Sequence, residues 1–240
     1  MLVEVCANSL QSALNAQSAG ADRIELCSEL AVGGITPSYG LLNSIRQHIS
    51  IPVHVLIRPR SGDFSYSDEE FEIMKTDIAL SVELGFDGIV SGILHKDFTL
   101  DEERTKMLVE LSGSLKFTFH RAFDWVEDPV ETLSQLEDLG VDYVLTSGQQ
   151  KSAVEGMALL TELQQKASKC IIMPGGGVRT DNVHLFQEAR FSAIHLSGTK
   201  FSQTLAKLPR VSMNSPSFLK DSEIAHTAID TIREIVNAVK

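Results

Sequence analysis

Two cysteines in the N-terminal part of the chain are candidate ligands for a soft metal ion. Cys6 ends the strand-like run "LVEVC" at residues 2–6, and Cys27 ends the similar run "RIELC" at residues 23–27. If these runs are neighbouring parallel strands about 4.8 Å apart, both sulfurs lie at the same edge of the sheet. Thiolates select Cu(I) or Zn²⁺, so the pair predicts a metal site. The alternative is that each thiol is a small buried hydrophobe.

Three arginines predict a second kind of site, one for a small anion. Arg58 and Arg60 follow the run "VHVLI" in "IRPRSGDF", and Arg121 follows the run "KFTFH" in "HRAFD". A guanidinium group matches the geometry of phosphate and carboxylate, so several at one end of a sheet favour an anionic ligand. The alternative is structural pairing with nearby acidic side chains.

A glycine run and two titratable residues extend this prediction. Gly175, Gly176 and Gly177 connect a strand-like run to a helical segment in "MPGGGVRTDN". Loops after the seventh and eighth strands of (β/α)8 barrels often bind phosphate through backbone N–H groups, so we expect these glycines at the anion site. Acid–base chemistry at such a site would use Glu25 and His120 to carry protons.

The chain alternates strand-like runs with helical segments along its whole length. The runs cover residues 2–6, 23–27, 53–57, 87–91, 116–120, 142–146, 170–174 and 192–197. Helical segments between them begin at Ser or Asp caps, and several end at a glycine, such as Gly20, Gly85 and Gly140. Eight alternations over residues 1–240 predict an α/β fold with one domain, a (β/α)8 TIM barrel. A doubly wound open sheet is the alternative, but it usually carries a glycine fingerprint where this chain has "CANS".

Side chains alternate along a strand, which predicts the residues that line the barrel interior. The apolar set is expected to face the helices and comprises Val3, Val5, Ile24, Leu26, Val53, Val55, Ile57, Phe117, Phe119, Tyr143, Leu145, Ile194 and Leu196. The opposite set is expected to face the lumen and comprises Glu4, Cys6, Glu25, Cys27, His54, Arg58, Thr118, His120, Thr146, His195 and Ser197. Buried charges must pair or meet water, so this polar lumen predicts a site at the carboxyl ends of the strands. A structural ion-pair network that only fills the barrel is the alternative.

The overall composition restricts the class of function. A formal net charge of -11 disfavours a nucleic-acid surface, which would need clustered lysine and arginine. No run reaches the ~18 apolar residues of a membrane span, and the N-terminus lacks a signal-peptide pattern, so we expect a cytoplasmic protein. The 3 cysteines do not suggest a disulfide framework. Cys170, at the start of its run, is expected to be an inert core residue.

The longest segment without a clear pattern covers residues 198–221, between the last strand-like run and the last helical segment. Irregular loops of this length in compact domains are usually functional or mobile. Because this position in a barrel lies at the carboxyl ends of the strands, we expect an irregular loop that is either a lid over the mouth or a flexible insertion.

Several sequence blocks taken together resemble the CutC family of copper homeostasis proteins. The blocks are "EVC" (4–6), "GADRIELCSEL" (20–30), "GGITPSYG" (33–40), "IPVHVLIRPRSGDFSYSDEE" (51–70), "TFHRAFD" (118–124), "VLTSGQ" (144–149) and "MPGGGV" (173–178). The resemblance covers almost the whole chain and implies a single TIM barrel, a cytosolic location and a homodimer or higher homo-oligomer. It also implies a role in copper tolerance, with Cu(I) bound by the thiols of the "EVC" and "ELC" blocks, which are Cys6 and Cys27.

Two functional hypotheses follow. The first is a cytoplasmic copper homeostasis protein that binds Cu(I) through Cys6 and Cys27. The second is an enzyme acting on a small phosphorylated or carboxylate metabolite, in which the arginines and glycines named above hold the anion. The expected partners are a copper ion or a small anionic metabolite, with neither nucleic acid nor membrane. A barrel that serves only as an interaction scaffold would leave the polar lumen without a purpose.

Overall fold

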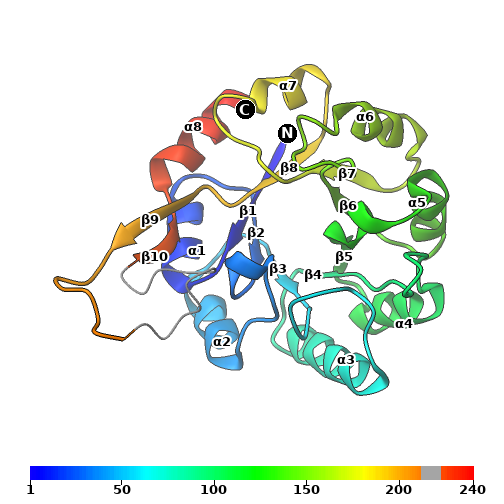
Figure 1. The fold of residues 1–240 in the computed structure, drawn as a ribbon, viewed down its shortest axis with the longest axis horizontal. Helices are drawn as coiled ribbons and strands as arrows, with labels where there is room; N and C mark the ends of the chain where they lie inside the picture. The colour runs from blue at the N-terminus through cyan, green and yellow to red at the C-terminus, as the bar shows by residue number, and fades with distance from the viewer. Residues whose placement is uncertain (212–222) are drawn as a thin grey trace.

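The computed structural model describes residues 1–211 and 223–240, and these residues form one domain built on a barrel of parallel strands. The barrel strands are β1 Leu2–Ala7, β2 Arg23–Leu26, β3 Val53–Leu56, β4 Gly88–Ser91, β5 Lys116–Phe119, β6 Tyr143–Thr146, β7 Ile171–Pro174 and β8 Ala193–Leu196. Their order is β7-β6-β5-β4-β3-β2-β1-β8, and an isolated parallel bridge between Gly175 and His195 brings the ends of β7 and β8 together (Figure 1). The predicted TIM barrel is therefore confirmed.

Helices surround the barrel and alternate with its strands. They are α1 Leu10–Ser18, α2 Tyr39–His48, α3 Asp68–Glu83, α4 Glu102–Ser112, α5 Pro129–Asp138, α6 Met157–Lys166, α7 Val183–Glu188 and α8 Ile229–Val239, with short 3-10 turns η1 Leu30–Val32 and η2 Arg121–Trp125. Five of them begin at a side chain that accepts a first-turn N–H, namely Ser9, Ser38, Ser67, Asp101 and Asp128. At α3 the cap is a reciprocal capping box between Ser67 and Glu70, which satisfies two N–H groups at once.

The apolar faces of the strands form one continuous core between barrel and helices. Val3, Val5, Ile24, Leu26, Val53, Val55, Ile57, Phe117, Phe119, Ile194 and Leu196 all belong to this core, as the alternation predicts. Burial of such side chains contributes roughly 1.5–3 kcal/mol each, which fixes the register of every strand and therefore which side chains face inward.

The predicted orientation of β6 is wrong. Val144 belongs to the outer core, whereas Tyr143 lies under the guanidinium of Arg23, 4.2 Å from the ring centre, inside the barrel. Leu145 likewise packs inside, with Met173 and other apolar residues. Thr146 therefore lies on the opposite face from the lumen. Both faces of "DYVLT" are apolar enough to be buried, so alternation alone could not select one.

Two glycines of the β4 region make room for lumen histidines. A Cβ atom at Gly88 would lie 2.4 Å from the ring of His54, and one at Gly92 would lie 2.6 Å from Nδ1 of His120. Both histidines are buried. The absence of a side chain on this part of the wall is thus what allows two imidazole rings to fit beside it.

Replacing Gly92 by alanine is expected to lower the free energy of unfolding by about 1–3 kcal/mol, because the added methyl group overpacks the wall against His120. Urea unfolding of the purified protein measures this change. Gly40→Ala is the matched control, since its Cβ would meet no atom nearer than 4.0 Å and it lies within α2. That variant should be as stable as the wild type or slightly more stable, by up to about 1 kcal/mol. Equal stability of Gly92→Ala and wild type would contradict the packing described here.

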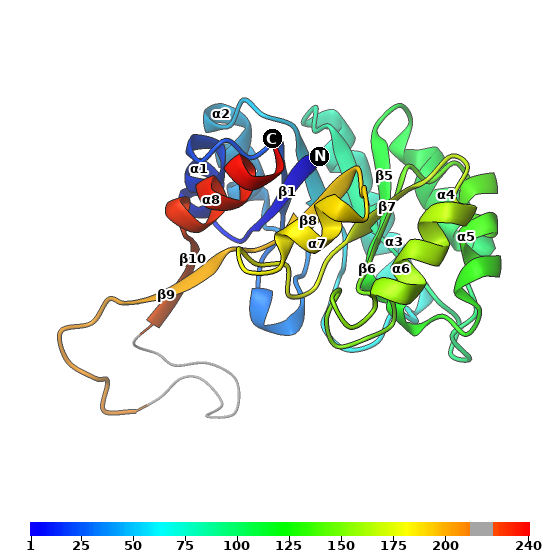
Figure 2. The same cartoon turned by 90° about the horizontal axis from the view of Figure 1, so that it is seen from above.

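A two-stranded arm follows β8. Its strands are β9, Thr199–Gln203, and β10, Glu223–Thr227, which pair antiparallel and extend away from the barrel beyond the strand ends (Figure 2). The base of the arm is fastened to α1, because Asn15 donates a hydrogen bond of 2.9 Å to the carbonyl of Thr227. The prediction of an irregular loop is therefore wrong at Thr199–Gln203, where backbone pairing orders the chain.

The remaining part of that prediction concerns the lid. Residues 212–221 lie outside the described residues, so a lid role for this segment stays a prediction. Within residues 1–211 and 223–240, no helix has the length and apolar character needed to cross a membrane.

Candidate functional site

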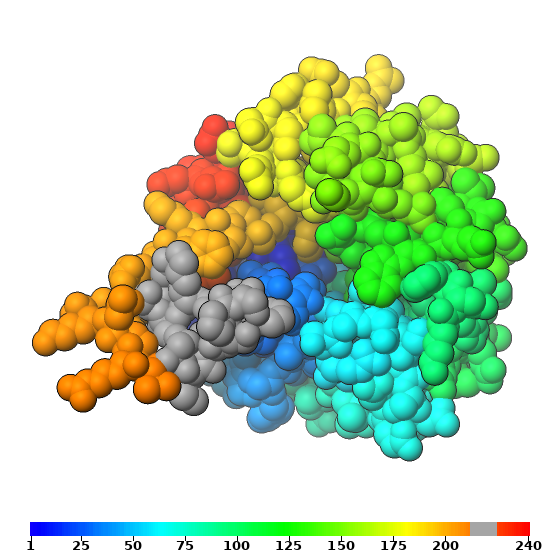
Figure 3. Space-filling model, in the orientation of Figure 1, coloured from blue at the N-terminus to red at the C-terminus, as the bar shows by residue number. Residues whose placement is uncertain are grey.

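A cavity of about 1090 Å³ opens at the carboxyl ends of the strands, and the surface is hollowed there (Figure 3). Its lining includes Cys6, Glu25, Arg58, His120, Arg121, Gly176, Gly177, His195 and Ser197. Most of the predicted site residues therefore lie around one space. Three predicted residues do not line it: Cys27 lies behind Cys6, Gly175 packs against Leu145 and His195, and Arg60 lines a separate pocket.

The two candidate metal-binding thiols lie next to each other. The Sγ atoms of Cys6 and Cys27 are 3.3 Å apart, and both cysteines are free and buried. They form a small cluster with Leu56 and Val90 inside the barrel. The loop at Gly34 covers them, since a Cβ there would lie 3.3 Å from Cβ of Cys27. The two sulfurs thus lie side by side in a pocket with apolar neighbours.

The thiol of Cys6 holds its proton strongly. Its hydrogen bond with Cys27, followed by burial, raises the pKa of Cys6 well above the ordinary value. Glu25 adds to this effect, with Oε1 at 3.3 Å from the sulfur of Cys6. A cation that binds here must displace the thiol proton, so binding is expected to release protons.

Glu25 has an unusual environment for a carboxylate. Its side chain is buried, Oε1 faces the sulfur of Cys6, and Oε2 has no hydrogen-bond partner among the described residues. Burial raises the pKa of Glu25. A buried acceptor without a partner costs about 1–3 kcal/mol, and more if charged. This oxygen is therefore an atom that a bound cation would stabilise.

A layer of charged side chains lies beneath the thiols. Glu4 accepts from Nε of Arg23 at 2.5 Å and lies 2.9 Å from Nδ1 of His195. Burial alone would raise the pKa of Glu4, but Arg23 and His195 outweigh it and lower that pKa to about 2. Burial alone would lower the pKa of His195, but the carboxylates of Glu25 and Glu4 outweigh it and raise that pKa. Glu4 is thus charged at neutral pH and supports the histidine.

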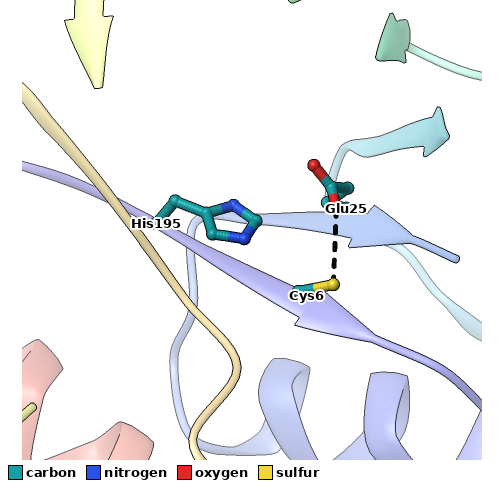
Figure 4. Close-up of side chains that lie close together, drawn as sticks. All are labelled: Cys6, Glu25 and His195. Carbon is teal, nitrogen blue, oxygen red and sulfur yellow. Dashed lines mark hydrogen bonds between the residues drawn. The ribbon is translucent and has the colours of Figure 1, made fainter. Parts of the chain in front are cut away.

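The histidine in this layer also faces the thiol region. Because the carboxylate of Glu4 can only accept, Nδ1 of His195 carries the shared hydrogen and Nε2 is left for another partner. The ring points toward Cys6 and Glu25 (Figure 4). One sulfur, one carboxylate oxygen and one imidazole nitrogen from these residues lie within 4.8 Å of one another.

Comparison with known proteins then gives the family. The model of the CutC family matches residues 1–200. The chain belongs to the CutC family. It is 46% identical over 230 residues to the family protein CutC of Edwardsiella ictaluri, covering 96% of this chain and 91% of that protein. The corresponding protein of Erwinia tasmaniensis is 42% identical over 238 residues, covering 99% of this chain and 94% of that protein.

Solved structures agree with this assignment. A protein of Streptococcus agalactiae that carries the name copper homeostasis protein CutC is 36% identical, with a TM-score of 0.77 over 81% of this chain and 97% of that chain. Thiamine phosphate pyrophosphorylase of Pyrococcus furiosus covers 99% of this chain and 94% of that chain, with 13% identity and a TM-score of 0.59. At that identity the second likeness shows the shared barrel fold alone.

Arg58 of this CutC-family chain is mainly a structural residue. Its Nη1 donates to the carbonyls of Val32 and Gly34 at 2.8 and 2.9 Å, and its Nη2 donates to that of Gly62 at 2.8 Å. The guanidinium lies over the ring of Phe64, 5.0 Å from its centre. These contacts hold the loop that contains Gly33 and Gly34 over the pocket of the two thiols. Nε is buried and has no partner among the described residues, and Nη2 keeps a second N–H beyond its bond to Gly62.

The other two predicted anion-binding arginines differ from each other. Arg60 lies outside the cavity and pairs with Glu70 at 2.6 Å and Asp63 at 3.0 Å, which is the structural alternative for this residue. Arg121 lies in the cavity wall, held by Asp124 at 2.7 Å, with 46% of its side chain exposed. Of the three predicted arginines, Arg121 is thus the one that keeps an accessible guanidinium in the cavity wall.

His120 is a neutral hydrogen-bond donor. Its Nδ1 accepts from the N–H of Ala122 at 3.2 Å, so Nε2 carries the proton. Burial, followed by the charge of Arg58, lowers the pKa of His120 to about 3. Nε2 is buried and has no partner among the described residues. At neutral pH this side chain therefore offers an N–H to a ligand.

Two functional features escaped the sequence analysis. One is the turn of His195 toward Cys6 and Glu25, which depends on the pairing of β8 with β1. The other is Asp124, which accepts from the hydroxyl of Thr146 at 2.5 Å and from the backbone N–H of Ser147 at 2.9 Å. Its place three residues after Arg121 was the available signal, since that spacing allows a local ion pair.

Proposed function

We propose that this CutC-family protein binds Cu(I) in copper homeostasis, with the thiolates of Cys6 and Cys27 as ligands. The observation that supports this function is the pair of free, buried sulfurs 3.3 Å apart. Soft thiolates select Cu(I) over harder cations. The name of the Streptococcus agalactiae relative points to the same metal, and the residues present fit it.

The surroundings of the thiols suit a soft ion. Leu56 and Val90 keep the pocket apolar, and Arg58 fixes the loop that closes it through the carbonyl of Gly34. A water-poor shell restricts access to a bound metal and tunes its properties. Cys6 lines the cavity and Cys27 does not, so an arriving ion would meet the sulfur of Cys6 first.

Replacing Cys27 by serine tests the proposal. Under anaerobic, reducing conditions we expect one Cu(I) per chain in competition with a coloured Cu(I) chelator, and a loss of affinity of at least about 100-fold in Cys27→Ser. Loss of an outer-shell partner alone typically costs 10–100-fold, so loss of a ligand should cost at least as much. Cys170→Ser is the matched control, because that thiol lies buried elsewhere and donates to the carbonyl of Val141. Unchanged Cu(I) affinity in Cys27→Ser would remove the proposal.

The cavity supports a second function. We propose that it also holds a small carboxylate or phosphate compound, as an enzyme of this fold would. The supporting observation is that His120, whose Nε2–H has no partner among the described residues, lines the same cavity as Arg121 and Glu25. Gly176 and Gly177 have φ of 97° and 79°, which bends the loop beside Arg121. Glu25, whose pKa is raised by burial, would exchange protons with such a compound, and His120 would donate a hydrogen bond to it.

Thermal shift measurements test this second function. A ligand at 100 times its Kd stabilises the folded protein by about 2.7 kcal/mol. We expect a hit in a panel of small phosphorylated and carboxylate metabolites, and a loss of that shift in Arg121→Gln. Arg60→Gln is the matched control, because that arginine lies outside the cavity. A panel without any hit would count against the anion site.

Oligomeric state and location stay predictions. Strand β9 and the described residues that follow it expose four apolar side chains, Phe201 by 60%, Leu205 by 42%, Leu208 by 71% and Val211 by 76%. Exposed apolar patches often mark interaction surfaces, which agrees with a homodimer or higher homo-oligomer. The cytoplasmic location that the family resemblance implies is also untested.

A further inference from the structure

We infer that Cys6, Glu25 and His195 form a binding site for a divalent cation of the zinc class, open to the barrel cavity. The three side chains come from β1, β2 and β8, and one ligand atom from each lies within 4.8 Å of the others (Figure 4). Cys27 falls outside this set. The site shares Cys6 with the proposed Cu(I) pocket, but it does not rest on that proposal.

The first supporting feature is the second shell of the histidine. Metal-binding histidines usually donate their other ring N–H to a carboxylate, which fixes the tautomer and the ring orientation. His195 has this arrangement, with Nδ1 2.9 Å from Oε1 of Glu4. Glu4 is itself fixed by Arg23 at 2.5 Å, and both are buried. The remaining nitrogen, Nε2, is therefore preset as a ligand.

The second supporting feature is the orphaned oxygen of Glu25. Oε2 is buried without a hydrogen-bond partner among the described residues, although a carboxylate of this kind is normally satisfied. A cation bound to Glu25 would neutralise the carboxylate and so lower the cost of leaving this oxygen unpartnered. This observation is independent of the histidine, and it favours a cation at the same carboxylate.

The spacing of the ligand atoms is close to that of a zinc site. Zinc–ligand distances of about 2.0–2.3 Å in a tetrahedron place ligand atoms roughly 3.3–3.8 Å apart. The sulfur of Cys6 and Oε1 of Glu25 are already 3.3 Å apart. The widest separation within the set, up to 4.8 Å, needs a contraction of about 1 Å, which small side-chain rotations supply.

The mixture of donor atoms selects the class of cation. One sulfur, one nitrogen and one oxygen suit Zn²⁺, whereas Cu(I) prefers sulfur and Mg²⁺ or Ca²⁺ prefers oxygen alone. Cys6, Glu25 and His195 all line the cavity, so a fourth coordination position faces that space. Three protein ligands with one open position are typical of catalytic zinc sites. A carboxylate or phosphate oxygen in the cavity could occupy that position.

Metal titrations of purified, reduced wild type and variants test the inference. We expect one Zn²⁺ per chain by calorimetry, and one Co²⁺ with a thiolate charge-transfer absorption band that shows the bond to sulfur. Glu25→Gln, which keeps the side-chain shape, should lower the affinity for both ions at least about tenfold. Cys27→Ser should leave both affinities unchanged. His48→Gln, at an exposed histidine of α2, is the matched control and should also leave them unchanged.

The two metal proposals fail separately. Glu25→Gln should weaken the binding of Zn²⁺ and leave the affinity for Cu(I) nearly unchanged. Cys27→Ser should weaken the binding of Cu(I) and leave the affinity for Zn²⁺ nearly unchanged. Zn²⁺ affinity unaffected by both Glu25→Gln and His195→Gln, in variants with wild-type circular dichroism, would overturn the divalent site. Absence of Cu(I) binding in a protein that still shows the Zn²⁺ dependence on Glu25 would remove only the copper proposal.

Discussion

Replacing Glu4 by glutamine is expected to lower the free energy of unfolding by about 3–5 kcal/mol, as is usual when one member of a buried ion pair is removed. Glu4 is fully buried and contacts Arg23 at 2.5 Å and His195 at 2.9 Å. An amide cannot neutralise Arg23, whose guanidinium would stay buried with an uncompensated charge. Urea unfolding of the wild type and the variant measures the difference.

An exposed ion pair provides the matched control for Glu4. Glu72 on α3 pairs with Lys75 at 2.7 Å, and 67% of the Glu72 side chain is exposed. Glu72→Gln should change the free energy of unfolding by less than about 1 kcal/mol, because exposed pairs contribute little. If Glu4→Gln costs no more than Glu72→Gln, the charged layer is not the support described here.

The same layer should make stability depend on pH. The pKa of Glu4 falls from 4.5 to about 2 on folding, so its contribution is present above pH 4.5 and is lost as pH falls toward 2. The pKa of His195 is raised from 6.5, so its contribution is full below that pH and is lost as pH rises through the raised pKa. The difference in stability between wild type and Glu4→Gln should therefore be largest between about pH 4.5 and 6.5.

Replacing Cys6 by serine is expected to reduce affinity for both Cu(I) and Zn²⁺ by at least about 100-fold, since even outer-shell losses cost 10–100-fold. Cys6 is the ligand common to both proposed sites, with its sulfur 3.3 Å from both Cys27 Sγ and Glu25 Oε1. Serine has nearly the same volume, so the barrel should fold normally. Chelator competition for Cu(I) and calorimetry for Zn²⁺ measure the two losses. Retention of either affinity in Cys6→Ser would show that the corresponding ion binds elsewhere.

Much of the fold could be predicted because two patterns in the sequence lead to the same architecture. Strand-like runs alternate with capped helices, and most runs place apolar residues on one face and polar ones on the other. β6 was assigned wrongly because the partner of Tyr143 is Arg23, which lies on a strand that is not adjacent to it. β9 was missed because the strand that pairs with it begins only at Glu223. Both errors concern contacts between distant parts of the chain.

The residues of the candidate site likewise fall into those that strand register could place and those that depend on contacts outside the strands. Cys6 and Cys27 were found together because they lie at the carboxyl ends of neighbouring strands: Cys6 precedes the last residue of β1, and Cys27 directly follows β2. Arg60 lies in a loop past β3, where strand alternation no longer applies, and it turns to Glu70 at the start of α3. The role of His195 depends on barrel closure, which joins it to Glu4 across 191 residues of sequence.

X-ray absorption at the copper edge of the Cu(I)-loaded protein tests the central claim most directly. The claim is that the sulfurs of Cys6 and Cys27 hold one Cu(I) between them. The spectrum is expected to show two sulfur neighbours in the wild type and one in Cys27→Ser. A first shell made only of nitrogen or oxygen, or two sulfur neighbours that persist in Cys27→Ser, would contradict it.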